Sequence, residues 1–139
     1  VGGVITTKTE AQAEGMGTDI DFSYLVTKDA LMGSLQSATK GVYLLDGSSI
    51  INRMGIATVG AGGSTTAAKK CRVSILVIVE QQAGSGWDYW TSWTVTEENS
   101  YSASASRAIP VATGHAYRVR CTHSAGTDAG SSWTGALQM

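Results

Sequence analysis

The two cysteines of this chain hold matching positions in two segments that alternate like β-strands. In residues 71–79 every second residue is apolar and falls on the side of Cys71, because successive side chains of a strand point to opposite faces. In residues 115–121 the same alternation puts Tyr117 on the side of Cys121. Two inward-facing thiols can meet inside a layered β-structure. We therefore expect one inter-strand or inter-sheet disulfide.

A bond between Cys71 and Cys121 closes a loop of roughly fifty residues, for which chain entropy gives about 4 kcal/mol of stabilisation. That is a large share of the stability of a small domain. The alternative is that both residues are free thiols that pack as small apolar side chains. A disulfide also predicts an oxidising compartment, so we expect a secreted or cell-surface protein.

Length and composition limit the classes of protein that the chain can belong to. A chain of 139 residues suits one domain with a real core. Charged residues make up 15% and the net charge is −1, so neither nucleic acid nor an anionic membrane is an expected partner. No stretch approaches the roughly 18 apolar residues of a membrane span.

The N-terminal residues look like an extension to the domain. The chain starts at Val1 without a basic segment or an apolar signal core, and we interpret it as a mature chain whose signal peptide was removed. Residues 1–17 are rich in Gly, Thr and Ala and contain one short β-prone run that includes Val4 and Ile5. We expect an extension over residues 1–17 and a single domain over residues 18–139.

Apolar alternation predicts a series of short strands. The first half of the chain is predicted to hold strands at residues 19–26, 42–45 and 49–59, with a loop or one helical turn at 27–41, a hairpin turn at Asp46 and Gly47, and a flexible loop at 60–66. The second half is predicted to hold strands at residues 70–81, 87–96, 101–109, 115–124 and 131–138, with a turn at 84–86 and a stop at Pro110. Short strands at such spacing without a helical period favour an all-β, antiparallel sandwich.

Residues 109–121 carry a family resemblance in the run Ile-Pro-Val-Ala-Thr-Gly-His-Ala-Tyr-Arg-Val-Arg-Cys. This run resembles the tyrosine-corner loop and strand of immunoglobulin-like and fibronectin-type domains, with Tyr117 as the corner residue. The resemblance implies an immunoglobulin-like sandwich in which the Tyr117 hydroxyl bonds to nearby backbone. It also implies that Trp87, Trp90 or Trp93 packs against the disulfide. Tyr117 precedes Cys121 by four residues, whereas antibody-type domains place the tyrosine two before.

A second resemblance covers residues 71–139. They resemble small secreted proteins of Gram-positive bacteria that belong to families without assigned function. What this resemblance implies is an extracellular location, not an activity.

Catalytic residue types are present without a catalytic pattern. His115, His123, Ser124 and Asp128 lie close in sequence and include a nucleophile, a base and an acid. No Gly-x-Ser-x-Gly signature accompanies them. We expect hydrogen-bonded strand histidines and no enzymatic activity.

Metal and phosphate signals are weak. Asp19 and Asp21 share one face of the predicted first strand, and with Asp29 or Asp46 they would offer oxygen ligands to calcium. No twelve-residue calcium loop surrounds them, and residues 60–70 lack the Gly-Lys-Ser or Gly-Lys-Thr ending of a phosphate loop. We expect solvated carboxylates, no metal and no cofactor.

The aromatic segment at residues 87–96 is the best binding candidate. Alternation puts its other aromatic residues, Trp87, Tyr89 and Trp93, on the core face and leaves Trp90 alone among polar neighbours. Trp90 either packs against a neighbouring segment or contacts a ligand or partner, and Trp133 can join it.

Two functions follow from this pattern. The first is a secreted structural subunit that assembles with itself into an oligomer or filament, with residues 1–17 added as a strand to the next subunit. The alternative is a carbohydrate- or ligand-binding module that uses an exposed Trp and Tyr face, with a glycan as partner.

Overall fold

A computed structural model describes residues 16–39 and 42–139 of the chain. In this part the chain forms nine strands, one short 3-10 helix and no α-helix, which confirms the all-β class. The elements are β1 Thr18–Asp19, the 3-10 helix η1 Phe22–Tyr24, β2 Leu31–Ser34, β3 Ser37–Thr39, β4 Leu44–Gly55, β5 Thr58–Ala83, β6 Gly86–Pro110, β7 Ala116–Ala125, β8 Asp128–Trp133 and β9 Leu137–Gln138. The predicted donor residues Val4 and Ile5 lie outside the described residues.

The framework of the fold is the hairpin of β5 and β6, which are 26 and 25 residues long. Its ladder runs from the pair Thr58 and Pro110 to the pair Ala83 and Gly86. The turn is where the sequence predicts it, and Gly84 adopts the positive φ of 61° that glycine accepts without strain.

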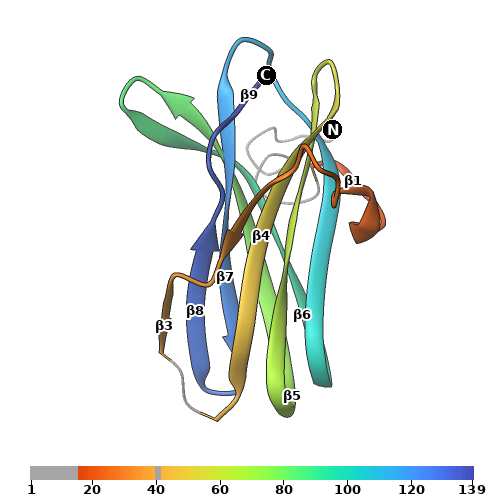
Figure 1. The fold of residues 1–139 in the computed structure, drawn as a ribbon, viewed down its shortest axis with the longest axis vertical. Coiled ribbons are helices and arrows are strands. Elements are labelled where there is room, and N and C mark those ends of the chain that lie inside the picture. The colour runs from red at the N-terminus through yellow and green to blue at the C-terminus, as the bar shows by residue number, and fades with distance from the viewer. Residues whose placement is uncertain (1–15, 40–41) are drawn as a thin grey trace.

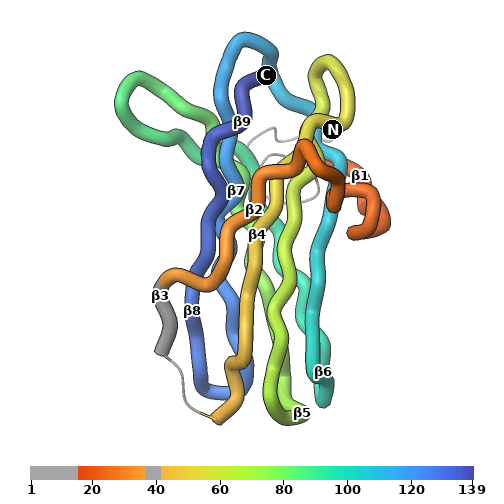
Figure 2. The backbone as a smooth tube through the Cα atoms, in the orientation of Figure 1, coloured from red at the N-terminus to blue at the C-terminus, as the bar shows by residue number. Residues whose placement is uncertain are grey.

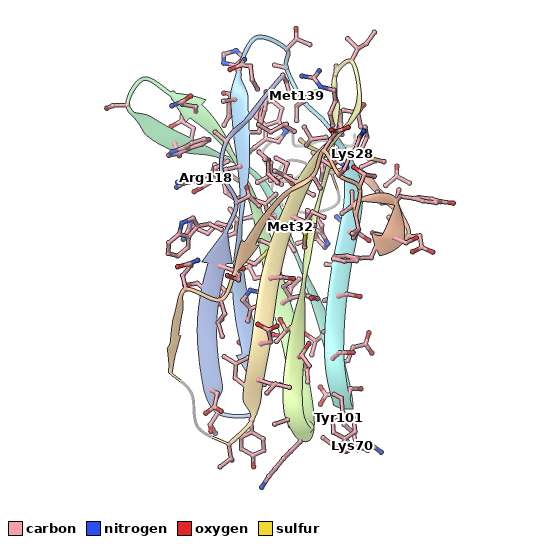
Figure 3. All side chains as sticks on the ribbon, viewed as in Figure 1. Lys28, Met32, Lys70, Tyr101, Arg118 and Met139 are labelled. Atoms are coloured by element: carbon pink, nitrogen blue, oxygen red, sulfur yellow. The ribbon has the colours of Figure 1, made fainter. Side chains whose placement is uncertain are left out.

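This hairpin bends sharply halfway along its length. The ladder shifts register between Thr66 and Cys71 and again between Cys71 and Val73. Figure 2 shows both strands reversing direction at the lower end of the molecule, and Figure 3 shows Lys70 and Tyr101 at this bend. Extra residues in a ladder raise its local twist and allow such a corner. Each long strand is therefore divided into two halves.

The two halves of β5 have different neighbours. The first half lies between β4 and the second half of β6, and β2 continues beyond β4. The second half lies between β7 and the first half of β6, and β8 and β3 continue beyond β7. All pairs are antiparallel, as predicted, and hydrogen bonding links the nine strands of the described part into one sheet (Figure 1).

The folded sheet brings its two parts face to face. The Thr65 hydroxyl on β5 lies 2.7 Å from Nδ1 of His123 on β7. Most of the core between the parts is aliphatic, and its largest fully buried side chains include Ile51, Val59, Ile75, Val77, Val79, Ile109, Tyr117 and Val119. The inward phase predicted for residues 71–79 and 115–121 is therefore confirmed.

The prediction of a flexible loop at residues 60–66 is wrong, because these residues are part of β5. Gly62 and Gly63 are required by close approach of other backbone, and Gly60 by close approach of the Leu25 and Met54 side chains. A Cβ on Gly62 would lie 2.2 Å from the Ala105 carbonyl oxygen, and a Cβ on Gly63 would lie 2.4 Å from that of Ser48. Composition suggested a loop where close packing of strands requires glycine.

The hairpin turn predicted at Asp46 and Gly47 is also wrong. Both residues lie inside β4 and pair with Thr66 and Thr65. Gly47 is needed because the His123 ring packs on it, with Cδ2 2.6 Å from the place of a Cβ. The turn between β4 and β5 comes later, at Ile56 and Ala57.

The strand predicted at residues 19–26 is reduced to β1 and the helix η1. Asp21 ends the extended segment because its carboxylate accepts hydrogen bonds from the backbone N–H and the hydroxyl of Ser23. These bonds lower the pKa of the Asp21 carboxyl. An aspartate in this position is a preferred helix N-cap, so local capping outweighs the alternation of apolar residues.

The expected disulfide is absent, since Cys71 and Cys121 are both free. Both side chains point to the expected face, but they lie at different positions along the strand direction. Cys121 pairs with Val77, which is six residues beyond Cys71 on the same strand. That spacing is about 20 Å along a strand, whereas bridged Cα atoms lie within about 7 Å of each other. The residue that faces Cys121 across the core is Gly63, whose missing Cβ would lie 2.9 Å from the sulfur.

The Tyr117 hydroxyl is held by three hydrogen bonds. It donates to the Ala112 carbonyl over 2.7 Å and accepts from the Ala112 backbone N–H over 3.0 Å. Gln81 Nε2 also donates to it over 3.0 Å. These bonds fix the crossover from the second half of β6 to β7, and so hold one part of the folded sheet against the other.

We predict that the two thiols differ in reactivity. Burial raises the pKa of the Cys121 thiol far above its usual range, and reagents react with the thiolate. Titration with an aromatic disulfide reagent should therefore modify Cys71 alone in the native protein and both cysteines in denaturant. Cys71→Ser should abolish the native reaction. Equal reaction of both thiols in the native protein would contradict the buried position of Cys121.

We predict that Gly63→Ala lowers the free energy of unfolding by about 2 kcal/mol or more, because the new methyl group overlaps backbone that cannot move freely. Gly86→Ala is the matched control, since its Cβ meets nothing closer than the Ala83 carbonyl oxygen at 3.9 Å. Urea unfolding of both variants measures the difference. Equal stability of the two variants would show that the close approach at Gly63 is not a constraint.

Candidate functional site

A β-bulge at Trp90 decides which aromatic side chains of β6 reach the surface. Val79 pairs with Thr91, and the next residue, Glu80, pairs with Tyr89. Trp90 is thus an extra residue in β6. An extra residue shifts the alternation of the side chains by one position. Two residues an even number of positions apart normally share a face, but they point to opposite faces when the bulge lies between them.

The bulge reverses the expected faces of Trp87 and Tyr89. Both were predicted to lie in the core with Trp93. Trp93 is buried, as predicted, whereas Tyr89 is 52% exposed and Trp87 is half-buried. Simple alternation missed these residues as surface groups. The only sequence signal was the crowding of three aromatic residues, Trp87, Tyr89 and Trp90, within four positions of a strand.

Trp90 packs into the molecule and does not form the exposed platform. Its ring meets the Tyr117 ring edge-on, with centroids 5.7 Å apart and planes at 75°. Its Nε1 donates to the Pro110 carbonyl over 3.1 Å. Of the two roles considered for Trp90, packing against a neighbouring segment is the one that these contacts describe.

The outward side chains near the bulge form a surface that we call the Trp-Arg face. Antiparallel partners share a face of the sheet, so register defines two adjacent rows across the strands. The first row is Tyr89, Glu80 and Arg118, and the second is Ser92, Ile78, Arg120 and Trp133. Trp87 stands beside the first row, under the guanidinium group of Arg118. Trp133, the second predicted contact residue, is 43% exposed.

Charged groups hold the centre of the Trp-Arg face in place. The Glu80 carboxylate accepts from Arg118 Nε over 2.8 Å and from Arg120 Nη2 over 3.3 Å. The Arg118 guanidinium carbon lies 4.4 Å from the centroid of the Trp87 ring, a cation–π contact. The Tyr89 hydroxyl is hydrogen-bonded to Ser92 over 2.8 Å. Two guanidinium groups and one carboxylate leave the face with one net positive charge.

The second candidate site is the edge of β6. One edge of β6 is paired with β5 along its whole length. In the described part of the chain the other edge is paired only near its end, where Thr18 and Asp19 of β1 meet Ala108 and Arg107. Figure 1 shows β1 as a short segment beside the much longer β6. Residues 91–96 of this edge contain no charge, glycine or proline.

A groove of about 360 Å³ runs beside this edge. Trp93 and Val95 line it from the first half of β6, residues 104–106 from the second half, and Ile20 and Phe22 from the segment after β1. Arg107 contacts two of the lining residues, because its guanidinium carbon lies 4.9 Å from the Trp93 ring centroid and its Nε donates to the Asp19 carboxylate over 2.9 Å. The groove thus lies beside an edge that no described strand covers along residues 93–96, and its wall combines apolar side chains with the carboxylates of Asp19 and Asp21.

The carboxylates considered for calcium have other partners. Asp19 pairs with Arg107, and Asp21 caps η1. Asp46 accepts from the Gly47 backbone N–H. Among residues 16–39 and 42–139, no three His, Cys, Asp or Glu side chains gather in a way that could hold a metal ion.

The residues considered for catalysis are dispersed. His115 is exposed, and the Asp128 carboxylate accepts from the backbone N–H groups of Tyr43 and Leu44. Ser124 and His123 are neighbours on β7 and so point to opposite faces of the sheet. No surface brings a nucleophile, a base and an acid of this set together.

His123 is a fully buried structural histidine. The Thr65 hydroxyl donates to the Ser74 carbonyl, so Nδ1 of His123 donates to Thr65 and Nε2 accepts from Ser132 over 2.7 Å. This is the neutral ring. Burial lowers its pKa from 6.5 to about 4, against a smaller opposing effect of Asp46. The site has no access for a substrate.

Comparisons with protein-family models, with curated proteins and with solved structures found no match. No helix of the described residues is long and apolar enough to cross a membrane.

We predict that acid weakens the fold through His123. A folded-state pKa of about 4 lies below the unfolded value of 6.5, so the unfolded chain binds the proton first as the pH falls. Stability present above pH 6.5 should fall by about 3 kcal/mol by pH 4. Chemical unfolding at a series of pH values measures the slope. His123→Gln should flatten it between pH 5 and 7, whereas His115→Gln, at an exposed site, should leave it unchanged. A slope unaffected by His123→Gln would contradict the assignment.

Proposed function

We propose that the protein is a structural subunit that assembles with copies of itself by β-strand addition. The observation that carries this proposal is the edge of β6 at residues 93–96, which pairs with no strand among residues 16–39 and 42–139 and has a groove beside it.

A strand edge that no other strand covers is a binding site because its backbone N–H and C=O groups can form hydrogen bonds with an added strand. Natural proteins protect such edges with charges, prolines or covering segments. Residues 91–96 are Thr-Ser-Trp-Thr-Val-Thr, all of which favour strands or are small and uncharged. The nearest charges along the strand are Asp88 and the pair Glu97 and Glu98. This composition supports pairing with another strand.

The groove adds selectivity to the edge. In strand addition, main-chain hydrogen bonds supply affinity and alternate side chains enter pockets. A strand beside residues 91–96 would send every second side chain into the groove next to Trp93 and Val95, and the others to the solvent side beside Ser92 and Thr94. The expected guest is therefore a short segment that favours the strand conformation and places at least one apolar side chain in the groove.

The guest that fits this description within the chain is residues 4–7, Val-Ile-Thr-Thr, from a second copy. All four residues favour strands. The segment that follows leads in each subunit to Met16 and β1, whose Thr18 and Asp19 already pair with β6. A donor strand from the next subunit would thus extend a mode of pairing that the chain uses for itself.

The finer fold and the location belong to the same proposal. We propose an immunoglobulin-like sandwich of the fibronectin type. The order of neighbouring strands supports this fold. One part of the sheet has the order β4, first half of β5, second half of β6. The other part has the order β8, β7, second half of β5, first half of β6. A secreted or cell-surface location is supported by the weakly charged, polar composition, and no longer by a disulfide.

We predict that the full chain forms concentration-dependent oligomers and that Val95→Lys abolishes them. Val95 is half-buried at the groove, and an inward-pointing lysine at a strand edge opposes docking. Val42→Lys is the matched control, because Val42 is 59% exposed and does not line the groove. Light scattering coupled to gel filtration gives the mass of each species.

Deletion of residues 1–15 tests the identity of the guest. The shortened chain should be a monomer that binds a synthetic peptide of residues 1–10, and Val95→Lys should remove that binding. A full chain that stays monomeric at all concentrations, or a shortened chain that still assembles, would sink the proposal.

A further inference from the structure

The Trp-Arg face lies on a different surface from the β6 edge groove and has features that strand addition does not explain. A bulge costs one ladder position and leaves an extra residue unpaired, and bulges commonly redirect side chains at functional sites. Here the bulge at Trp90 turns Trp87 and Tyr89 to the outside. Three large aromatic side chains, those of Trp87, Tyr89 and Trp133, consequently border one strip of the sheet that is polar apart from Ile78.

The centre of this face is built for a charged ligand. Glu80 is 8% exposed, and its carboxylate orients two arginines whose side chains are 28% and 45% exposed. Each guanidinium group has five N–H donors, and the contacts with Glu80 use one from each. The two rows contain no other charged residue of β5, β7 or β8. The positive charge that Arg118 and Arg120 have in excess of Glu80 is therefore not balanced within the two rows.

The geometry favours an extended ligand that lies flat. Tyr89 on β6 and Trp133 on β8 stand three strand spacings apart, about 14 Å across the sheet. The groups between them are planar guanidinium groups, a carboxylate, the Ser92 hydroxyl and the aliphatic side chain of Ile78. Aromatic rings bind the apolar faces of sugar rings, and the donors between them suit hydroxyl and carboxylate groups.

We infer that the Trp-Arg face binds an acidic polysaccharide, with a short run of sugar rings lying across the strands from Tyr89 to Trp133. Arg118 and Arg120 pair with uronic-acid carboxylates, and Trp133 and Tyr89 stack against sugar rings. Glu80 is a positioning residue that holds the two arginines in plane. The bulge at Trp90 is the backbone feature that supplies the Trp87 and Tyr89 side of the site.

Polygalacturonate is a suitable probe, because its methyl ester has the same backbone without the charge. The full-length protein should bind polygalacturonate in affinity electrophoresis and in calorimetry. It should bind the fully esterified polymer at least about tenfold more weakly, a difference of about 1.4 kcal/mol. Binding should weaken further as salt screens the arginines. Equal binding of the two polymers, or none to either, would overturn the inference.

Variants of exposed side chains locate the site. Trp133→Ala and Arg120→Ala should each weaken binding at least about tenfold. Arg120→Lys should restore only part of it, since lysine lacks the planar pair of donors. Tyr101→Ala is the matched control, because Tyr101 is 54% exposed at the bend, outside the two rows. Unchanged binding in Trp133→Ala and Arg120→Ala would overturn the inference.

Val95→Lys separates this inference from the proposed assembly. It alters the groove at the β6 edge and leaves the Trp-Arg face intact, so it should bind polygalacturonate like the unmodified protein. If Trp133→Ala instead changes the oligomeric state without changing polysaccharide binding, the face is a contact between copies and the inference fails.

Discussion

The fold depends on one constraint, which is that the two continuous strands β5 and β6 must bend together at the same place. β5 and β6 pair on both sides of the bend at residues 67–72, and within the bend Cys71 pairs with Ser100, so the two parts of the sheet are linked there both by the chain and by pairing. This linkage explains how the parts face each other closely without a disulfide. The separation between them is set by contacts such as Thr65 to His123 and Gly63 to Cys121, which demand small residues on the β4 and β5 side.

The second constraint is the phase of β6, which changes at the bulge. Before the bulge, Trp87 and Tyr89 face outward, and after it Trp93 faces inward. The same residue that causes the change, Trp90, fills the space beside Tyr117 and bonds Pro110. A single inserted position therefore links the core, the crossover held by Tyr117 and the outer surface. Substitutions at Trp90 would be felt in all three.

The sequence allowed the strand class and the inward phase of residues 71–79 and 115–121 to be predicted, because burial of alternate apolar side chains leaves a clear pattern. The sequence did not allow the register between neighbouring strands to be predicted. Cys71 and Cys121 have the same phase but lie several residue steps apart in register. The glycines at residues 60–63 were misread for a related reason, since glycine is used both for loops and for close packing. Only the position of the opposing backbone distinguishes these two uses.

The candidate site was hidden by the same kind of ambiguity. Alternation assigned Trp90 to the surface and Tyr89 to the core, and one extra residue in the ladder reversed both assignments. Bulges have no reliable sequence signature. The sequence therefore showed that residues 87–96 are rich in aromatic side chains, but not which of these side chains reach the surface.

The two proposed surfaces are geometrically compatible, because both belong to the part of the sheet formed by β8, β7, the second half of β5 and the first half of β6. A strand added to the β6 edge would extend this part sideways, in the plane of the sheet, and would leave its outer face uncovered. Every subunit of an assembly would then present one Trp-Arg face. Several weak sites on one assembly bind a long polymer far more tightly than one site does, since each binding event raises the effective concentration for the next. Assembly through the edge and polysaccharide binding through the face would in this way support each other, although neither site requires the residues of the other.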